Sequence, residues 1–479
     1  MASSRNPLAL GEALLAIAIS SVLFYFGLGL HPIWPLVWLA PLPLLVFALR
    51  GSWLAAGLAS IAAMMLGGVN MWGYLVTALG SPASVWFTVF LFAGVFFAAG
   101  VLLFRALVLR GALWSGLVAL PAAYTACEFL RNSITPHGSA GSLAYSQLNF
   151  VPFLQLASIT GPWGMTFVLL LFPSALAIAW HSRASEPQRG WRVLGGMLAL
   201  VAAVLVFGFV RLAVPTGDTV RVGLIAHDQP DSKPVADSGA ATEQLFTAYA
   251  DAAQRLAAEG AQAIVIPEKI AVTLDGKSGG SDAILQSLAN ETGATVVAGV
   301  VDVDGPVKYN QARIYTPDAA METYDKEHML PPFESNLKPG TSLAVLHRAQ
   351  QTWGVAICKD MDFGSPARRY GKVGAGLLLV PAWDFVMDGF YHGHIAVMRG
   401  VEDGFSVART AKNGLLYASD SRGRILGETS STSAPFATLL VNVPVAHSWT
   451  VYQAWGDWFA WVAIALLMFG VVQLLRQRV

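Results

Sequence analysis

The chain has 479 residues, of which 55% are hydrophobic and only 13% charged, and its mean hydropathy is +0.54. A soluble globular chain carries about 25% charged residues, so much of this chain is expected to lie in lipid. The net charge of zero gives no indication of nucleic-acid binding. Two cysteines, Cys127 and Cys358, exclude a disulfide framework and a cysteine-based zinc site.

Eight apolar runs in the chain are about as long as a membrane span. Most of the first seven are separated by short polar loops, but a long polar, Gly-rich segment, residues 132–161, lies between the fifth and the sixth. We predict a transmembrane helix over each run, although the second and the sixth are short. The first run is expected to be a retained helix rather than a signal peptide, because a second run follows it almost at once. The predicted spans are residues 8–30, 33–49, 53–76, 85–104, 113–130, 164–180, 193–210 and 458–475.

Loop arginines indicate how these spans are oriented. Arginine and lysine accumulate in cytoplasmic loops, and with eight spans most loop arginines fall on one side of the membrane. We therefore expect both termini in the cytoplasm and residues 214–450 outside it, between the membrane domain 1–213 and the last helix, 451–479. The arginines on the cytoplasmic side are Arg5, Arg50, Arg105, Arg110, Arg183, Arg189, Arg192, Arg476 and Arg478.

Two interpretations remain open for Glu128 and Arg131, which end the fifth span in "ACEFLR". They can form an interfacial ion pair. Alternatively, they can line a cavity for a lipid headgroup or an acceptor, since ionisable groups near spans are often functional.

The segment after the seventh span alternates between predicted strands and helices. Apolar, β-branched runs at 220–226, 261–268, 294–301, 352–358 and 374–383 indicate buried strands. Helical periodicity marks residues 242–258 and 281–291. This alternation predicts an α/β domain, in which reactive groups gather at the carboxyl ends of strands. Glu268, Cys358 and Trp383 occupy such positions.

Three residue types in this domain suit acyl transfer. Cys358 can act as a nucleophile once its thiolate forms, Glu268 can act as a general base, and an ammonium such as Lys326 can stabilise an oxyanion. Glu334, eight residues after Lys326, can hold that lysine or an acceptor amine in place. Each residue alone has an ordinary interpretation, as a core thiol, a solvated carboxylate or a surface lysine, so only the ordered set is informative.

That ordered set resembles the nitrilase, or carbon–nitrogen hydrolase, superfamily. The segments that carry the resemblance are "VIPEK", "KEHMLPPFES", "ICKDMDFG" and "PAWDF", followed by "ARTAKNGLLYASDSRGRI". The order Glu–Lys–Cys is the signature of that superfamily. With apolar helices on both sides, nearly the whole chain is similar to the apolipoprotein N-acyltransferase family.

The resemblance implies an αββα sandwich joined to a multi-pass helical membrane domain. It implies Glu268 as base, Lys326 as oxyanion stabiliser, Cys358 as nucleophile and Glu334 as a supporting carboxylate. A phospholipid would donate an acyl chain to the cysteine as a thioester. The amine of a diacylglyceryl-cysteine lipoprotein would then accept it, in a bacterial inner membrane with the catalytic domain in the periplasm. A monomer is expected, with no cofactor, no metal and no nucleic acid.

Departures from the family pattern leave the substrate more open than the reaction. Cys358-Lys359-Asp360 stands where the family has Cys-Tyr-Glu or Cys-Tyr-Asp. We therefore regard Trp383, Phe333 and Lys359 as candidate substrate-binding residues. A membrane-tethered amidase, or an acyltransferase for another amine, is the alternative. A non-catalytic binding protein is a third, disfavoured by the intact triad.

Three further features invite a functional interpretation. Residues 329–333 form either an apolar lid over Cys358 or ordinary core. Asp360 and Asp362 are expected to be solvated carboxylates at a strand end. His392 and His394 resemble a metal pair only superficially, and core or surface histidines are expected.

Overall fold

The computed structural model describes residues 7–228, 235–274, 279–348 and 350–476, which fall into two compact units. The described residues of the first unit lie in Met1–Ile134, Gly141–Arg211 and Trp455–Val479. Those of the second unit lie in Thr135–Ala140 and Leu212–Ala454. The predicted domain ranges 1–213, 214–450 and 451–479 remain predictions. They assign the short segment Thr135–Ala140 to the membrane domain, whereas the structure packs it within the second unit.

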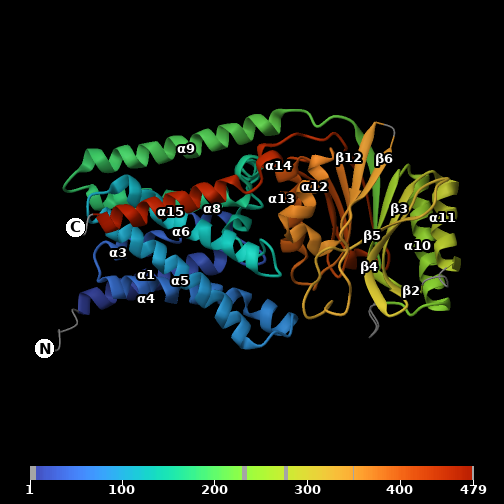
Figure 1. Cartoon of the computed structure of the whole chain (residues 1–479), viewed down its shortest axis with the longest axis horizontal. Helices are drawn as coiled ribbons and strands as arrows, with labels where there is room; N and C mark the ends of the chain where they lie inside the picture. Colours follow the sequence, from blue (N-terminus) through green and yellow to red (C-terminus); the bar gives the residue numbers. More distant parts are fainter. Residues whose placement is uncertain (1–6, 229–234, 275–278, 349, 477–479) are drawn as a thin grey trace. The chain divides into compact units, whose positions relative to one another are not determined.

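Seven helices among the described residues are long and apolar enough to cross a membrane. They cover seven of the eight predicted spans and confirm a multi-pass helical membrane domain (Figure 1). The helix at the sixth predicted span begins earlier than expected, and Gly161 and Pro162 bend it near its start. The seven are α1 (Pro7–Gly27), α4 (Trp53–Gly67), α5 (Ala83–Val108), α6 (Leu113–Ile134), α8 (Ala157–Ser182), α9 (Pro187–Ala213) and α15 (Trp458–Arg476).

The second predicted span, residues 33–49, does not form a single helix. It contains two short helices, α2 (Trp34–Val37) and α3 (Leu42–Ala48), and three prolines at 35, 41 and 43. Proline removes a backbone donor and clashes with the preceding turn, so it is tolerated only near a helix start. Pro35 and Pro43 occupy such starts. The structure therefore has the predicted apolar helical segment at Trp34–Ala48, but it is interrupted and shorter than the seven helices above.

The chain nevertheless returns along α1 through this broken segment. The ends of α1 and α4 meet, because a Cβ built on Gly67 would lie 2.4 Å from the Cβ of Phe24. Near the start of α1, Glu12 lies 3.6 Å from Arg50, just before α4. The two helices therefore run parallel, and the residues between them travel back over about 18 Å, which is the helical rise from Glu12 to Phe24.

Glu128 in α6 is buried and tied to neighbouring elements. Its carboxylate accepts hydrogen bonds from Ser142 Oγ at 3.0 Å, the Leu143 amide at 2.6 Å and Thr166 Oγ1 at 2.7 Å. These bonds join α6 to α8 and to the short helix η3 (Leu143–Gln147). Because a buried carboxylate is costly unless it is hydrogen-bonded, Glu128 fixes this part of the first unit.

The second unit contains two six-stranded sheets in the described part of the chain. In each sheet three parallel strands are flanked by antiparallel ones. The first sheet has the order β12 (Ala437–Pro444), β1 (Thr219–Ala226), β2 (Ala263–Leu274), β3 (Thr295–Asp304), β4 (Val307–Tyr315) and β5 (Glu322–Asp325). The second has the order β11 (Ile425–Ser430), β10 (Leu415–Ser419), β9 (Ser406–Lys412), β8 (Leu377–Trp383), β7 (Gln351–Val355) and β6 (Ala344–Arg348).

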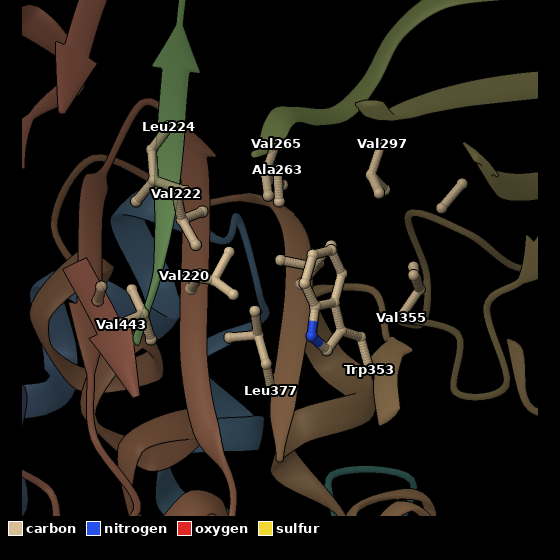
Figure 2. Packing of buried hydrophobic residues seen from close by; sticks show 14 of the residues in the cluster. Val220, Val222, Leu224, Ala263, Val265, Val297, Trp353, Val355, Leu377 and Val443 are labelled. Atoms are coloured by element: carbon tan, nitrogen blue, oxygen red, sulfur yellow. The ribbon is translucent and has the colours of Figure 1, made fainter. Parts of the chain in front are cut away.

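The inner faces of the two sheets pack against each other and form the main core. Figure 2 shows Val222 and Val265 of the first sheet in the same cluster as Trp353 and Leu377 of the second. All four side chains are nearly inaccessible to solvent. Full burial of an aliphatic side chain contributes about 1.5–3 kcal/mol, so this shared cluster holds the sheets face to face.

Helices cover the outer face of each sheet. Helices α10 (Ala240–Ala258) and α11 (Gly279–Thr292) join the parallel strands of the first sheet, and α12 (Gly364–Lys372) and α13 (Gly389–Asp403) join those of the second (Figure 1). Parallel strands need such crossover connections. The result is the expected αββα sandwich, with β2 packed against β8 and β9 across the two sheets.

Candidate active site

A bulge in β2 presents the Glu268 carboxylate. Pairing with β3 shifts between Ile266 and Ala271, and Lys269 within the bulge has a φ of 49°. The backbone of β3 approaches closely at Gly299, where an added Cβ would lie 2.5 Å from the Glu268 Cα. Only glycine fits there. Glu268 is 1% exposed, so its carboxylate requires partners inside the fold.

Lys326, directly after β5, supplies the first partner. Its backbone amide donates to the Asn310 carbonyl at 2.8 Å. Its Nζ lies 2.9 Å from Glu268 Oε1 and 2.8 Å from Glu334 Oε2. Burial lowers the pKa of this lysine, but the two carboxylates outweigh burial and raise the pKa above its ordinary value. Lys326 is therefore a fixed cation.

Two residues that the sequence did not single out complete this cluster. Asn310 Nδ2 donates to Glu268 Oε1 at 2.5 Å and to Glu334 Oε1 at 2.8 Å. Lys269 Nζ lies 2.5 Å from Glu334 Oε1. Burial opposes ionisation of Glu334, but the ammoniums of Lys326 and Lys269 lower its pKa to about 2. Glu334 is consequently a permanent carboxylate that orients both lysines.

Cys358 begins a short 3-10 helix, η4 (Cys358–Asp362), just after β7. Its φ of 43° is rarely adopted by a residue with a side chain, and its Sγ lies 3.7 Å from the Trp383 carbonyl oxygen. Burial and the Glu268 carboxylate raise the pKa of the thiol, while Lys326 acts in the opposite direction. The resting group is thus a thiol, and it needs a base before it can attack.

Asp360 ties the turn that bears Cys358 to the loop that bears Lys326. One of its oxygens accepts from the amides of Glu327 at 3.1 Å and His328 at 2.8 Å. The other accepts from the Ile357 amide at 3.1 Å. Asp360 is 0% exposed and Asp362 is 2% exposed, so the prediction of solvated carboxylates was wrong. Backbone amides replace water around the Asp360 carboxylate, and the side chains of His392 and Lys359 lie beside the Asp362 carboxylate.

Lys359 is turned toward Asp362 and the segment Thr135–Ala140. Its Nζ lies 3.8 Å from Asp362 Oδ2 and 3.4 Å from His137 Nδ1. Burial lowers the pKa of Lys359. Ser139 donates from both its amide and its hydroxyl to the Asp362 carbonyl. Segment Thr135–Ala140 therefore packs on the turn that carries Cys358, and Lys359 belongs to that contact.

The other two candidate binding residues lie apart in the chain: Trp383 ends β8, and Phe333 lies in the turn that follows Lys326. The Trp383 ring faces Lys412 Nζ at 3.8 Å and Lys269 Nζ at 5.1 Å. Phe333 is 49% exposed, and its ring lies 5.2 Å from that of Phe385. Every residue from 329 to 333 is at least partly exposed, so this run is not ordinary core. Its role as a lid remains a prediction.

The two histidines of "YHGH" contact oxygen atoms of the protein. His392 lies 3.1 Å from Asp362 Oδ1 and 3.6 Å from Asp388 Oδ2, and His394 lies 2.8 Å from the Phe390 carbonyl. Burial lowers the pKa of His392, but the carboxylates, Asp362 above all, raise it to about 9. His392 is therefore a cation that helps to hold Asp362 and the Cys358 turn.

Comparisons with known proteins cover both units. The family model "Apolipoprotein N-acyltransferase N-terminal domain" matches residues 20–176, and the model "Carbon-nitrogen hydrolase" matches residues 229–450. An apolipoprotein N-acyltransferase from Geobacter metallireducens is 27% identical over 384 residues, covering 73% of this chain and 72% of the relative. One from Gloeobacter violaceus is 24% identical over 484 residues, covering 91% and 89%.

Among solved structures, the chain is similar to an amidase from Nesterenkonia sp. AN1 in complex with butyramide. The two are 22% identical, with a TM-score of 0.39, and the match covers 48% of this chain and 94% of the amidase.

Proposed function

Because the chain belongs to the apolipoprotein N-acyltransferase family, we propose that it moves an acyl chain from a phospholipid to the N-terminal amine of a diacylglyceryl-cysteine lipoprotein. The acyl chain would travel as a thioester on Cys358. The chain is an acyltransferase of the nitrilase superfamily with several membrane-spanning helices. The residues that perform the reaction, the acyl donor and the acceptor are the proposed part.

One observation carries the assignment of residues: the Lys326 ammonium lies between two buried carboxylates, Glu268 and Glu334, and its charge acts on the partly buried Cys358 thiol. A cation fixed in this way can stabilise negative charge that develops on a carbonyl oxygen. Glu268 shares that cation and is the base for the thiol, and Glu334 positions the lysine.

The first half-reaction acylates Cys358. Glu268 removes the thiol proton, Sγ attacks the phospholipid ester carbonyl, and Lys326 stabilises the oxyanion of the tetrahedral intermediate. When the ester C–O bond breaks, Glu268 returns the proton to the departing lysophospholipid oxygen. No net proton is gained or lost. Dividing the transfer into two steps in this way is the usual advantage of a covalent nucleophile.

The second half-reaction releases the acyl chain to an amine. The neutral amine attacks the thioester, the same oxyanion forms near Lys326, and the C–S bond breaks. Glu268 takes one proton from the attacking nitrogen and delivers it to Sγ, which restores the thiol. The product is an amide, and the thiol is ready for another phospholipid.

We expect phospholipid alone to add the mass of one acyl chain to the protein, at Cys358. Because the lysophospholipid leaves before the amine arrives, the acyl-enzyme should persist until an acceptor is added. Intact mass spectrometry of the detergent-solubilised protein, before and after a diacylglyceryl-cysteine lipopeptide is added, measures both steps.

The same measurement separates the competing functions. Adduct loss that needs the lipopeptide and yields acylated peptide supports the transferase. Rapid loss to water, with release of free fatty acid, would favour a membrane-tethered hydrolase instead. If wild-type protein carried no adduct at any time point, the thioester route itself would be excluded.

The catalytic unit is proposed to face the periplasm, with both chain termini in the cytoplasm of a bacterial inner membrane. This orientation is supported by the grouping of loop arginines at one end of the first unit. Arg105 donates to the Ala48 carbonyl at 2.6 Å, and Arg50 and Arg183 line one small cavity of about 190 Å³. Arginines grouped in this way are typical of the cytoplasmic side.

Labelling of single introduced cysteines tests this orientation. In a background with Cys127→Ala and Cys358→Ala, we expect a membrane-impermeant maleimide to label Asp304→Cys in intact spheroplasts. Ser185→Cys, between α8 and α9, should be labelled only after lysis. Both positions are exposed in the structure. The reverse pattern would place the catalytic unit in the cytoplasm and would remove the proposed lipoprotein acceptor.

A further inference from the structure

Lys412, the last residue of β9, is a buried amine that the proposed mechanism has not used. It is 3% exposed. Its Nζ donates to the Lys269 carbonyl at 2.9 Å and lies 3.8 Å from the centre of the Trp383 ring. Pairing of the parallel strands β8 and β9 sets Lys412 beside Trp383 in register.

The two residues that contact Lys412, Trp383 and Lys269, lie next to the reacting groups. The Trp383 carbonyl accepts a hydrogen bond from Cys358 Sγ at 3.7 Å. Trp383 therefore contacts the Lys412 amine through its ring and the Cys358 thiol through its backbone. Lys269 follows Glu268 in the β2 bulge. Lys412 therefore contacts the segments that hold both the nucleophile and the base.

Charges around Lys412 favour proton exchange near neutral pH. The groups that face it are Lys269 and Glu268 from β2 and Asp228 after β1. Burial, and then the Lys269 ammonium, lower the pKa of Lys412 to about 7, although the two carboxylates oppose them. An amine with such a pKa can take up and release protons during catalysis.

Proton balance in the second half-reaction requires one more acceptor than the triad supplies. An N-terminal amine has a pKa of about 8, so it arrives largely as an ammonium with three N–H bonds. The amide product keeps one. Glu268 transfers a single proton from nitrogen to the departing Sγ, which leaves one proton to be removed before the nitrogen lone pair can attack the thioester.

We propose that neutral Lys412 removes this proton, so that it acts as the base for the acceptor amine. The Nζ lone pair forms a new N–H bond, the acceptor ammonium becomes a neutral nucleophile, and Lys412 later returns the proton to water. This inference rests on the proposed function. It gives Lys412 a role in aminolysis of the thioester, which separates it from the residues that form the thioester.

Single-turnover aminolysis as a function of pH tests this role. The protein is first acylated with phospholipid, and lipopeptide-dependent loss of the adduct is then followed by intact mass between about pH 5.5 and 9.5, around the amine pKa. In wild-type protein the rate should rise through pH 7, following Lys412. The variants are Lys412→Met and Lys412→Arg, with exposed Lys372→Met in α12 as the matched control.

In both Lys412 variants we expect aminolysis at pH 7 to fall roughly 100-fold or more, the usual contribution of a positioned base. The remaining rate should rise near the pKa of the amine, at about pH 8, and acyl-enzyme should accumulate in the presence of lipopeptide. Lys372→Met should follow the wild-type profile. Since Lys412→Arg preserves a cation, a shared defect in both variants would identify the neutral amine as the active form.

Two results would overturn the inference. One is a wild-type rate and pH profile in both Lys412 variants. The other is an equal loss in acylation and in aminolysis, which would make Lys412 a support for Trp383 and Lys269. If wild-type protein formed no adduct, the proposed function and this inference would fail together. An adduct whose aminolysis ignores Lys412 would remove this inference alone.

Discussion

Replacing Cys358 by alanine is expected to abolish acyl transfer while the protein still folds and inserts. The proposed thioester needs a sulfur at this position, and loss of a covalent nucleophile lowers turnover on the order of 10⁴–10⁶-fold. Alanine keeps the Cβ and accepts the same φ of 43°, so backbone strain is unchanged. The stability change should stay within about 1 kcal/mol, as for removal of one small buried group. Lipopeptide turnover and thermal unfolding in detergent measure the two effects separately.

Cys127 offers a matched control for this experiment. It is the other thiol of the chain, 5% exposed within α6, and a buried cysteine of this kind behaves as a small apolar residue. Cys127→Ala should therefore retain near-parental turnover and near-parental melting. Full turnover in Cys358→Ala would rule out the covalent route, and a large loss in Cys127→Ala would assign α6 a role beyond packing.

The sequence predicted the parts of the fold that depend on local pattern. Long apolar runs mark seven of the membrane helices, because hydrocarbon requires a continuous apolar surface. Buried strands such as β1 and β3 appear as β-branched runs of the expected length. The interruption within residues 33–49 has the same local origin. Composition there is apolar enough, but Pro41 and Pro43 lie where a continuous helix would need their backbone donors, whereas Pro35 lies at a helix start.

Two members of the candidate site, Glu268 and Cys358, were predicted because they follow recognisable strands. Lys326 and Glu334 were predicted from their residue types and from the ordered set that resembles a known superfamily. The structure brings Glu268, Lys326 and Glu334 into hydrogen-bonding contact. Asn310 was missed because its role depends on which strand pairs with β3. The signal in the sequence was a polar amide, Asn310, within the run that forms β4, and the structure shows that this position is fully buried.

Lys269 and Lys412 were missed for a related reason. Both sit at backbone irregularities or strand ends whose partners lie far away in sequence, 65 residues from Lys269 to Glu334 and 143 from Lys412 to Lys269. In the sequence each resembles a surface lysine. Only the packing of β2 against β9 shows that they share one buried cluster. Contacts between side chains of two different sheets depend on the tertiary fold, so the periodicity of apolar residues along one strand does not predict them.

Replacing Lys326 by methionine should remove both catalysis and a substantial part of the stability of the catalytic unit. The side chain is 2% exposed and contacts two buried carboxylates. Removing one partner of a buried ion pair costs about 3–5 kcal/mol, because the remaining charge is left uncompensated. Loss of an oxyanion donor lowers turnover about 10²–10³-fold. Denaturant unfolding and adduct formation with phospholipid measure the two losses.

A matched control and a double-mutant cycle separate the structural effect from the catalytic one. Lys308 lies on the exposed side of β4, so Lys308→Met should change stability by no more than about 0.5 kcal/mol. Adding Glu334→Gln to Lys326→Met removes one of the two carboxylates that Lys326 neutralises, and Lys269 can then serve Glu268 alone, so the double variant should be more stable than the two single losses predict. The expected coupling is about 0.5–3 kcal/mol. Adduct formation should stay low in the double variant, because restored stability does not replace the oxyanion donor. If adduct formation recovered together with stability, Lys326 would be a structural cation rather than a catalytic one.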